Sequence, residues 1–300
     1  MKFVVTGGAG FIGSHLTKFL LENGHDVIVI DNLARGSMKN LKEVESKIEF
    51  HKISILEYDK LKEIVKNVDG VFHQAALAFI PDSFKDPEKY YQVNAIGTEN
   101  ILKLSKEFGF KVVFASSSSI YGDQTKFPIK EDASRNSLNP YGESKLRAEK
   151  FAEQYAKDGV KVIGLRYFNV FGIGQNPNYA GVIPIFMERL SENKPPIIEG
   201  DGTQIRSFTY VDDVVNANFL AFRSNVDHAF INIATNQKTS INELAKIMIK
   251  LSGKSLKPIY DKPRQGDIHT SIADITLAEK LIEWSPKVSL DEGLKKIFTI

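Results

Sequence analysis

The 300-residue chain contains no cysteine, which excludes disulfide bonds, thiolate zinc sites and a cysteine nucleophile. It has only six histidines, none at the spacing of metal ligands, so no metal site is expected. No apolar run approaches the roughly 18 residues that cross a bilayer. A formal net charge of +2 gives no electrostatic reason for binding nucleic acid or an anionic membrane. We therefore expect a globular, cytoplasmic protein.

What the sequence does contain is a glycine-rich turn close to its start. An apolar run at 3–6 ends in Gly7, Gly10 and Gly13, and an amphipathic helical pattern follows over 12–22. Strand, glycine turn and helix form the context of a dinucleotide-phosphate site, because glycine lets a pyrophosphate approach the backbone and the helix N-terminus offers unpaired N–H groups. Such turns also occur without a ligand, so the next segment is needed to decide between the two interpretations.

That segment ends in a carboxylate. Asp31 follows the second apolar run, 27–30, and lies eighteen residues past Gly13. In dinucleotide-binding folds a carboxylate at the tip of the second strand binds the adenosine ribose hydroxyls. It would also repel a 2′-phosphate, so the sequence favours NAD over NADP. The positive charge of Arg35, a few residues on, argues in the opposite direction.

Apolar strand-like runs alternate with helical patterns through the first half of the chain, which predicts an α/β fold with a doubly wound parallel sheet, the Rossmann arrangement. After residue 166 prolines and glycines become frequent and helices alternate with irregular segments. We therefore expect a dinucleotide-binding domain at 1–166 and a smaller substrate-binding lobe at 167–300, partly interleaved with it. Strands are expected at 3–6, 27–30, 48–51, 70–73, 111–116 and 161–166, and helices near 12–22, 58–67, 88–107, 142–157, 183–193, 212–223, 240–252 and 290–298.

Two further motifs carry groups suited to acid–base chemistry. Tyr141 and Lys145 are four residues apart, so a helix presents both on one face. A phenol is a poor base at neutral pH, but an adjacent cation favours the phenolate. Upstream, the strand at 111–116 runs into four consecutive serines, 116–119, whose hydroxyls would lie near a cofactor at the carboxyl end of the sheet. Each feature alone occurs by chance, and most of these serines are expected to satisfy their own backbone.

In this order, the features resemble the extended short-chain dehydrogenase/reductase family and, within it, the nucleotide-sugar 4-epimerases typified by UDP-glucose 4-epimerase. The resemblance runs nearly the whole length of the chain and implies a homodimer, joined by two helices per subunit, here expected at 88–107 and 142–157. Further motifs carry it: Asp31-Asn32-Leu33, His73-Gln74-Ala75-Ala76, Asn94-Ala95-Ile96-Gly97-Thr98, Arg166-Tyr167-Phe168-Asn169-Val170, Gly200-Asp201-Gly202-Thr203-Gln204-Ile205-Arg206 and Arg264-Gln265-Gly266-Asp267.

The resemblance implies NAD and a transient oxidation at C4 of a nucleotide sugar. Tyr141, as phenolate, would remove the proton of the 4-hydroxyl while hydride passes to NAD. Ser117, four residues before the tyrosine of the Tyr121-Gly122 pair, would assist it, and Lys145 would favour the phenolate and bind the nicotinamide ribose. The cofactor contacts expected in all are Gly7, Gly10, Phe11, Ile12, Gly13, Asp31, Asn32, Ser54, Ile55, Gln74, Ala75, Ala76, Asn94, Tyr141, Lys145 and Phe168.

Contacts to the nucleotide of a UDP-sugar are implied as well. Arg206 and Arg264 match arginines that neutralise the pyrophosphate, and Asn169 matches a donor to the same phosphates. Asp267 matches a carboxylate on the nucleotide ribose, and Val182 falls where the family packs an apolar residue against the nucleotide.

The sugar itself would meet Ser117 and Ser271. Ser271, four residues past Asp267, falls at a gate where a bulky aromatic excludes an N-acetyl group. Serine should leave room for that group. The resemblance therefore predicts that UDP-glucose, UDP-galactose and the N-acetylated pair are all substrates.

Some positions depart from the family pattern. Ser54 stands where many members carry an aspartate that holds adenine, and Asp82 reverses the charge of a Pro-Arg-Ser motif common among near relatives. Ser118 and Ser119 replace the Asp-Glu pair of 4,6-dehydratases, and the glutamate of uronic-acid decarboxylases is absent, so neither reaction is expected. The alternatives that remain are a UDP-uronic acid 4-epimerase, a nucleotide-sugar reductase and, from another class, a non-catalytic NAD-binding protein.

Overall fold

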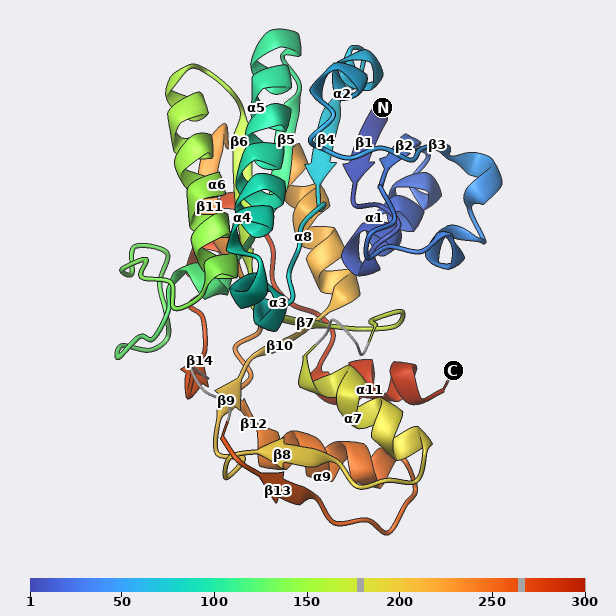
Figure 1. Cartoon of the computed structure of the whole chain (residues 1–300), viewed down its shortest axis with the longest axis vertical. Coiled ribbons are helices and arrows are strands. Elements are labelled where there is room, and N and C mark those ends of the chain that lie inside the picture. Colours follow the sequence, from blue (N-terminus) through green and yellow to red (C-terminus); the bar gives the residue numbers. More distant parts are fainter. Residues whose placement is uncertain (177–180, 264–267, 300) are drawn as a thin grey trace.

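The computed structural model describes residues 1–176, 181–263 and 268–299. A seven-stranded sheet forms the upper part of Figure 1, in the order β11-β6-β5-β4-β1-β2-β3, and every neighbouring pair in it is parallel. From β1 the chain adds β2 and β3 on one side, and then adds β4, β5, β6 and β11 on the other side of β1. This order confirms the predicted doubly wound topology. Its strands are β1 (Lys2–Thr6), β2 (Asp26–Ile30), β3 (Glu49–His51), β4 (Gly70–His73), β5 (Lys111–Ser117), β6 (Val162–Tyr167) and β11 (His228–Ile233).

Helices cover both faces of the sheet, because side chains alternate between the faces along each strand and both faces are apolar. In β1, Phe3 and Val5 pack into the core beneath α1 and α8, while Val4 packs into a second core beneath α2, α5 and α6. The bounds of these helices are α1 (Phe11–Glu22), α2 (Tyr58–Val65), α5 (Gly97–Phe108), α6 (Pro140–Lys157) and α8 (Val211–Arg223).

The remaining elements form a smaller lobe below the carboxyl edge of the sheet (Figure 1). β7 pairs with β10, β9 with β12 and β14, and β8 with β13. The strands are β7 (Asn169–Phe171), β8 (Ile197–Glu199), β9 (Ile205–Arg206), β10 (Phe208–Tyr210), β12 (Thr239–Ser240), β13 (Ile259–Asp261) and β14 (Thr270–Ser271). The helices are α7 (Val182–Ser191), α9 (Ile241–Leu251) and α11 (Leu290–Phe298), while α10 (Thr276–Ile282) packs back on the sheet side, against β11 and α8.

The sequence analysis missed one strand of the main sheet, as well as the short strands of the smaller lobe. β11 lies within the expected substrate lobe, yet it pairs with β6 and completes the sheet, and α8 just before it covers the sheet face. The chain therefore leaves the sheet after β6, returns for α8 and β11, and leaves again for β12. The expected boundary at residue 166 marks only the first of these passages.

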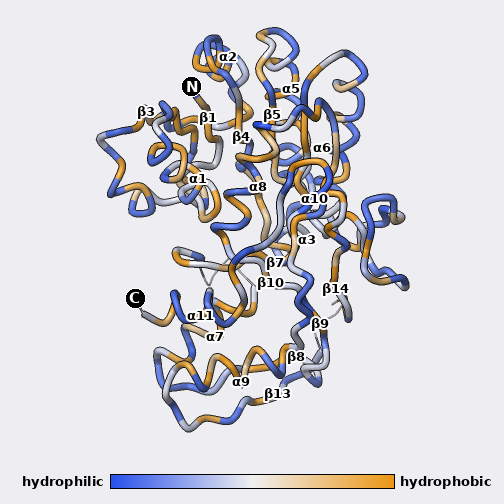
Figure 2. Tube along the Cα trace, turned by 180° about the vertical axis from the view of Figure 1, so that it is seen from behind, coloured by the Kyte–Doolittle hydropathy of each residue, from blue (hydrophilic) through white to orange (hydrophobic). Residues whose placement is uncertain are grey.

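The predicted helix at 88–107 is divided into pieces. It begins as α4 (Pro87–Tyr90), widens into a π-helical segment (Tyr91–Ile96) and continues as α5. A short helix, α3 (Ile80–Lys85), precedes it. Elsewhere the periphery is polar: Figure 2 shows hydrophilic residues gathered in the outlying loops. No helix in the three described ranges has the length and apolar character of a membrane span.

Candidate active site

A cavity of about 600 Å³ opens at the carboxyl ends of β1, β2, β4 and β5. This is the edge of a doubly wound sheet at which ligands bind. Among the expected NAD contacts, those that line the cavity are Gly7, Gly10, Phe11, Ile12, Gly13, Asp31, Asn32, Ser54, Ile55, Gln74, Ala75, Ala76, Tyr141, Lys145 and Phe168. Asn94 is the exception, and Ser117 lines the same cavity.

The glycine turn after β1 brings the backbone into the cavity wall. A Cβ on Gly13 would lie 2.2 Å from the Gly7 carbonyl oxygen, so the turn closes this tightly only without a side chain at that position. Gly10 is the N-cap of α1 and supplies no side-chain cap to the first N–H groups. Uncapped donors at the start of a twelve-residue helix, with positive partial charge, fit a pyrophosphate.

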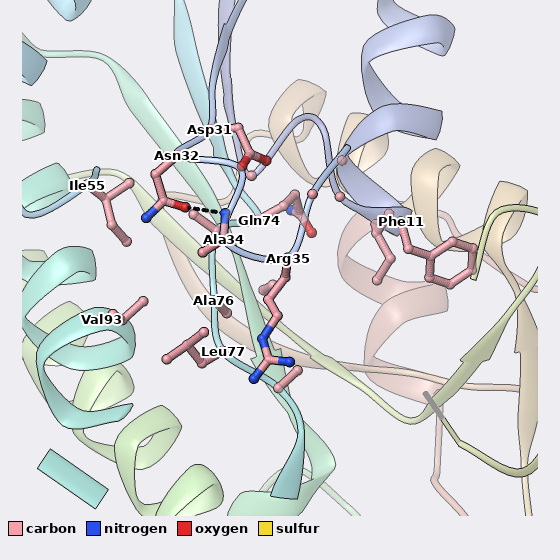
Figure 3. A pocket seen from close by; sticks show the side chains of 18 of the residues that line it. Phe11, Asp31, Asn32, Ala34, Arg35, Ile55, Gln74, Ala76, Leu77 and Val93 are labelled. Atoms are coloured by element: carbon pink, nitrogen blue, oxygen red, sulfur yellow. Dashed lines mark hydrogen bonds between the residues drawn. The ribbon is translucent and has the colours of Figure 1, made fainter. Parts of the chain in front are cut away.

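Asp31 lies beside the glycine turn, near Asn32 (Figure 3). Its carboxylate accepts hydrogen bonds from the backbone N–H groups of Ala9, at 3.0 Å, and Leu33, at 2.7 Å. Burial raises the pKa of Asp31, and these two hydrogen bonds oppose the rise. The amides therefore hold the carboxylate in place at the cavity wall, and a carboxylate with two accepted hydrogen bonds can still accept from ribose hydroxyls.

Ser54, the departure at the adenine end, caps a turn. Its hydroxyl accepts from the Leu56 N–H at 3.2 Å, and its own N–H donates to Glu57 Oε1 at 2.8 Å. Ser54 and Ile55 both line the cavity. The hydroxyl therefore stabilises the loop before α2, and a carboxylate for adenine is absent at this position.

Ser117, Tyr141 and Lys145 meet at one wall of the cavity. Ser117 ends β5, Tyr141 stands in the first turn of α6, and Lys145 follows one turn later. Ser117 accepts from the Ser119 N–H at 3.1 Å and hydrogen-bonds the Tyr141 phenol, which lowers the phenol pKa. Ser116 instead donates to Glu149 at 2.6 Å. Of the two buried serines that line the cavity, Ser117 is thus the one beside the phenol.

Burial governs the proton equilibria of this trio. It lowers the pKa of Lys145 to about 7, and the Lys145 ammonium donates to the Ala115 carbonyl at 2.8 Å. It raises the pKa of Tyr141 more than the Ser117 hydrogen bond lowers it. Both shifts favour the neutral forms, so the nearby charge that most favours the phenolate must come from a cation in the cavity, such as oxidised nicotinamide.

Gly142 lets the first turn of α6 approach the end of β5. A Cβ at this position would lie 2.2 Å from the Ser137 hydroxyl oxygen and 2.5 Å from the Ser119 carbonyl oxygen. Asn139 begins the helix, because its side chain accepts from the Gly142 N–H at 2.9 Å. Cap and glycine together place Tyr141 against Ser117.

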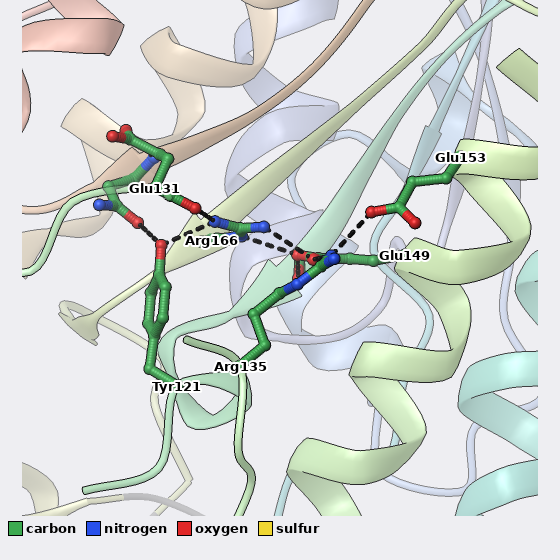
Figure 4. A network of polar contacts seen from close by, with 8 residues as sticks. Tyr121, Glu131, Arg135, Glu149, Glu153 and Arg166 are labelled. Carbon is green, nitrogen blue, oxygen red and sulfur yellow. Dashed lines mark hydrogen bonds and ion pairs between the residues drawn. The ribbon is translucent and has the colours of Figure 1, made fainter. Parts of the chain in front are cut away.

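Behind this wall lies a buried ionic network (Figure 4). Glu149, one turn beyond Lys145 on α6, is fully buried and accepts from Arg166 of β6 at 2.9 Å through each carboxylate oxygen. Arg166 also donates to the Tyr121 hydroxyl and to the Glu131 carbonyl, both at 2.8 Å. Burial would lower the pKa of Arg166, but Glu149 outweighs that effect and raises it. The network ties the catalytic helix to β5 and β6.

Asn94 was expected to bind the cofactor and has another task in the structure. It lies in the π-helical segment, where widened turns often mark functional sites. Its side chain accepts from the Leu77 N–H at 2.8 Å and donates to the Leu77 carbonyl and to the Ser144 hydroxyl, both at 2.9 Å. Asn94 therefore positions Leu77, which does line the cavity.

Apart from Ser117, the expected substrate contacts that the structure describes lie in the smaller lobe and do not line the cavity. Arg206 and Ser271 are paired neighbours on β9 and β14, and Arg206 donates to the His269 carbonyl at 3.2 Å. Asn169 begins β7 and donates to the Ser207 carbonyl at 3.3 Å, and Val182 begins α7. The structure thus brings Arg206 and Ser271 together. Arg264 and Asp267 lie outside the described residues.

Several cavity residues were not among the expected contacts. Arg35, Lys39 and Lys89 add positive charge to the lining, and Asn40 donates to the Ala9 carbonyl at 2.9 Å. Of these, only Arg35 carried a signal, as a cation close to Asp31. The others lie in loops and short helices whose course the sequence pattern does not fix.

Among the described residues, no metal site accompanies the cavity. Over the part of the chain that the structure describes, no three His, Asp or Glu side chains converge as metal ligands. His73 is buried between Thr6, at 2.6 Å, and Thr98, at 3.0 Å, and burial lowers its pKa to about 3. It is a neutral, hydrogen-bonded core residue.

Comparison with known proteins gives consistent results. Residues 3–234 match the model of the NAD dependent epimerase/dehydratase family. The chain is similar in structure to UDP-glucose 4-epimerase from Thermotoga maritima, solved with UDP-glucose, with a TM-score of 0.95 and 39% identity over 100% of this chain and 98% of that one. It is also similar to UDP-N-acetylglucosamine 4-epimerase from Methanobrevibacter ruminantium, solved with UDP-N-acetylmuramic acid. The TM-score is 0.95 and the identity 35%, over 99% of this chain and 97% of that one. For UDP-glucuronic acid 4-epimerase from Bacillus cereus, solved with UDP-glucuronic acid and NAD, the TM-score is 0.92 and the identity 34%, over 100% of this chain and 98% of that one.

These three enzymes act on differently substituted sugars, yet their likeness to this chain is nearly the same. Overall similarity therefore fixes the family and its cofactor, and it leaves the sugar open. Gly7, Gly10, Gly13, Asp31, Tyr141 and Lys145, on which the resemblance rests, all line the cavity. The chain belongs to the NAD dependent epimerase/dehydratase family, within the extended short-chain dehydrogenases/reductases.

Proposed function

We propose that the chain catalyses the NAD-dependent 4-epimerisation of a UDP-hexose, with UDP-glucose, UDP-galactose and their N-acetylated counterparts as substrates. The observation that carries this proposal is the meeting of Ser117, Tyr141 and Lys145 at one wall of the cavity that the glycine turn and Asp31 also line. A non-catalytic NAD-binding protein has no need of that trio.

The residues present fit NAD. The uncapped start of α1 and the side-chain-free turn at Gly13 would receive the pyrophosphate, and Asp31 would accept from the adenosine ribose hydroxyls. Lys145, which lines the same cavity as Ser117 and Tyr141, would bind the nicotinamide ribose. NAD, when bound, accepts hydride from C4 of the sugar and returns it to the opposite face, so no net oxidation results.

Tyr141 would hold and move the proton in this cycle. Its phenolate takes the proton of the sugar 4-hydroxyl, and the phenol returns it after the keto sugar has turned. Ser117 hydrogen-bonds the phenol and would orient the same sugar oxygen. Burial of the trio excludes water, which protects the keto intermediate and strengthens each electrostatic contact.

The smaller lobe would hold the nucleotide. Asn169, Val182 and Arg206 lie in it, at the starts of β7 and α7 and on β9, and the same role is proposed for Arg264 and Asp267. We infer a division of labour in which residues 1–166, with α8 and β11, bind NAD while most of 167–300 binds the UDP-sugar.

Assembly and location are inferred from the family resemblance. We infer a cytoplasmic homodimer that pairs through the helical region at 88–107 and α6. Phe108, Phe151 and Tyr155 are only partly buried and are available for such a contact, whereas Ile101 and Leu104 belong to the core. Sedimentation equilibrium of the purified protein would measure the dimer.

The test of the function is to incubate the purified protein, without added NAD, with UDP-galactose, UDP-N-acetylgalactosamine and UDP-glucuronic acid in separate reactions, and to separate the sugar nucleotides. The proposal expects the 4-epimers of the first two, without accumulation of NADH. Tyr141→Phe should retain NAD and lose turnover. Epimerisation of the uronic acid alone would replace the proposal by the uronic-acid alternative, and no reaction with NAD supplied would refute it.

The breadth of substrate is tested at the gate. Ser271→Tyr should lower turnover of UDP-N-acetylgalactosamine by about tenfold or more relative to UDP-galactose, because the ring would occupy the space of the acetyl group. Thr270→Val is the matched control, since neighbouring residues of a strand point to opposite sides. Equal loss of both activities would show that Ser271 does not select the sugar.

A further inference from the structure

An ion pair joins two segments on either side of the cofactor cavity. Arg35 lies in the loop after β2 and lines the cavity, and Asp82 lies in the first turn of α3, beyond β4. Arg35 Nη2 donates to Asp82 Oδ2 at 2.7 Å, and both side chains are about seven-tenths buried, with exposed fractions of 31% and 28%. Hydrogen bonding to Arg35, and then to Lys85, holds the pKa of Asp82 below its usual range.

This pair sets the direction of the Arg35 side chain. The next residue, Gly36, lies directly against the ribose-binding carboxylate, because a Cβ on it would be 2.9 Å from Asp31 Oδ2. The Arg35 side chain is therefore attached close to the position of the adenosine ribose. Figure 3 shows it extending away from Asp31 toward Leu77.

A guanidinium near the adenosine ribose is the group that binds a 2′-phosphate, because its planar set of donors matches phosphate oxygens. Arg35 would supply it if its side chain turned toward Asp31. In the structure it is turned away and its charge is met by Asp82. This resolves the conflict within the sequence, in which Asp31 favours NAD and Arg35 favours NADP.

We propose that Asp82 is a cofactor-selectivity residue, which holds the Arg35 guanidinium away from the ribose site and thereby makes the protein select NAD over NADP. Asp82 is not part of the cavity lining, so it acts through Arg35, as a positioning residue. The proposal also gives Asp82, a charge reversal against the family's Pro-Arg-Ser motif, a physical reason.

The experiment measures selectivity directly on the protein as purified. The protein is equilibrated with equal, large excesses of NAD and NADP, freed of unbound dinucleotide and denatured, and the two released cofactors are quantified. We expect the parent to carry almost only NAD. Asp82→Ala should raise the bound NADP to NAD ratio about fivefold, the size expected for redirecting one partly exposed charge. Because no sugar is present, the result does not depend on the epimerase reaction.

Three variants separate this mechanism from a general effect of charge. Glu88→Ala removes a carboxylate from α4, close in sequence, that accepts from Gln92 at 2.7 Å, and it should leave the ratio unchanged. Asp82→Ala combined with Arg35→Met should lose the gain in NADP, since the gain requires the guanidinium. Asp82→Glu should stay close to the parent.

The proposal is overturned if Asp82→Ala gives the parent's ratio, or if the gain persists in the double variant. Thermal unfolding of each variant accompanies the measurement. If Asp82→Ala lowers the midpoint markedly, Asp82→Asn, which keeps the shape of the side chain, takes its place with the same expected direction. A merely structural role would weaken both dinucleotides together and leave their ratio unchanged.

Discussion

The buried carboxylate of Glu149 gives a prediction of stability whose size follows from its contacts. Replacing it by glutamine removes the charge but keeps an acceptor oxygen, and leaves the buried Arg166 guanidinium without its counter-charge. Breaking a buried ion pair by removing one partner costs about 3–5 kcal/mol. Arg166 would keep its hydrogen bonds to the Tyr121 hydroxyl and the Glu131 carbonyl. We therefore expect Glu149→Gln to lower the free energy of unfolding by about 3 kcal/mol, the lower end of that range.

The assay is urea unfolding at saturating NAD, followed by the fluorescence of the single tryptophan, Trp284, which is buried and donates to the Asp213 carbonyl at 2.8 Å. Glu153→Gln is the matched control one turn further along α6. That residue pairs with Arg135 at 2.8 Å near the surface, so its loss should cost about 1 kcal/mol or less. A loss for Glu149→Gln no larger than that of the control would refute the reasoning.

A second comparison separates the pair from the packing around it. In the double variant Glu149→Met with Arg166→Met no unpaired charge remains, and apolar replacement of a buried ion pair is often close to neutral. The double variant should therefore be more stable than Glu149→Gln. If it is less stable, the hydrogen bonds of Arg166 to Tyr121 and Glu131 matter more than its pairing with Glu149.

Two further predictions concern the catalytic helix. Gly142→Ala should lower kcat about tenfold or more, with a modest loss of stability. The added Cβ would lie 2.5 Å from the Ser119 carbonyl oxygen and would push Tyr141 away from Ser117. An unchanged kcat would contradict this prediction. The folded-state pKa of Lys145 is about 7 and the unfolded value about 10.5, so its burial destabilises the fold fully below pH 7 and the cost disappears as the pH rises toward 10.5. Lys145→Met, saturated with NAD, should therefore unfold at a higher temperature than the parent near pH 6.5, and the difference between the two unfolding midpoints should narrow toward pH 10. The variant should lose activity. A lower midpoint than the parent's at both pH values would contradict the prediction.

Local patterns sufficed for the strands β1 to β6 of the sheet and for the glycine turn and Asp31 at the cavity. Apolar runs bounded by turns are buried strands in any such fold, and the positions of the glycine turn and Asp31 follow from where β1 and β2 end. β11 escaped prediction because its run, His228–Ile233, stands amid irregular segments and gains its place only by pairing with β6. Position in sequence gives no hint that the strand returns to the first domain.

Contacts between distant charges could not be predicted either. Glu149 reads as one more polar residue on an amphipathic helix, and only the packing of α6 against β6 shows that it meets Arg166. Asp82 and Arg35 are separated by two strands and a helix along the chain, so the pair exists only once the loops after β2 and β4 meet. Asn94 was predicted as a cofactor contact from its sequence motif. Its hydrogen bonds to Leu77 depend instead on the π-helical segment.

The interleaved path of the chain limits how the protein can admit its substrate. The chain passes between the sheet and the smaller lobe after β6, before α8, after β11, before α10 and again after α10. Hinge opening of the two lobes would require all of these connections to bend at once. Entry and release of a nucleotide sugar should therefore depend on local movement of loops at the rim, while the two lobes keep a fixed distance that suits one length of substrate.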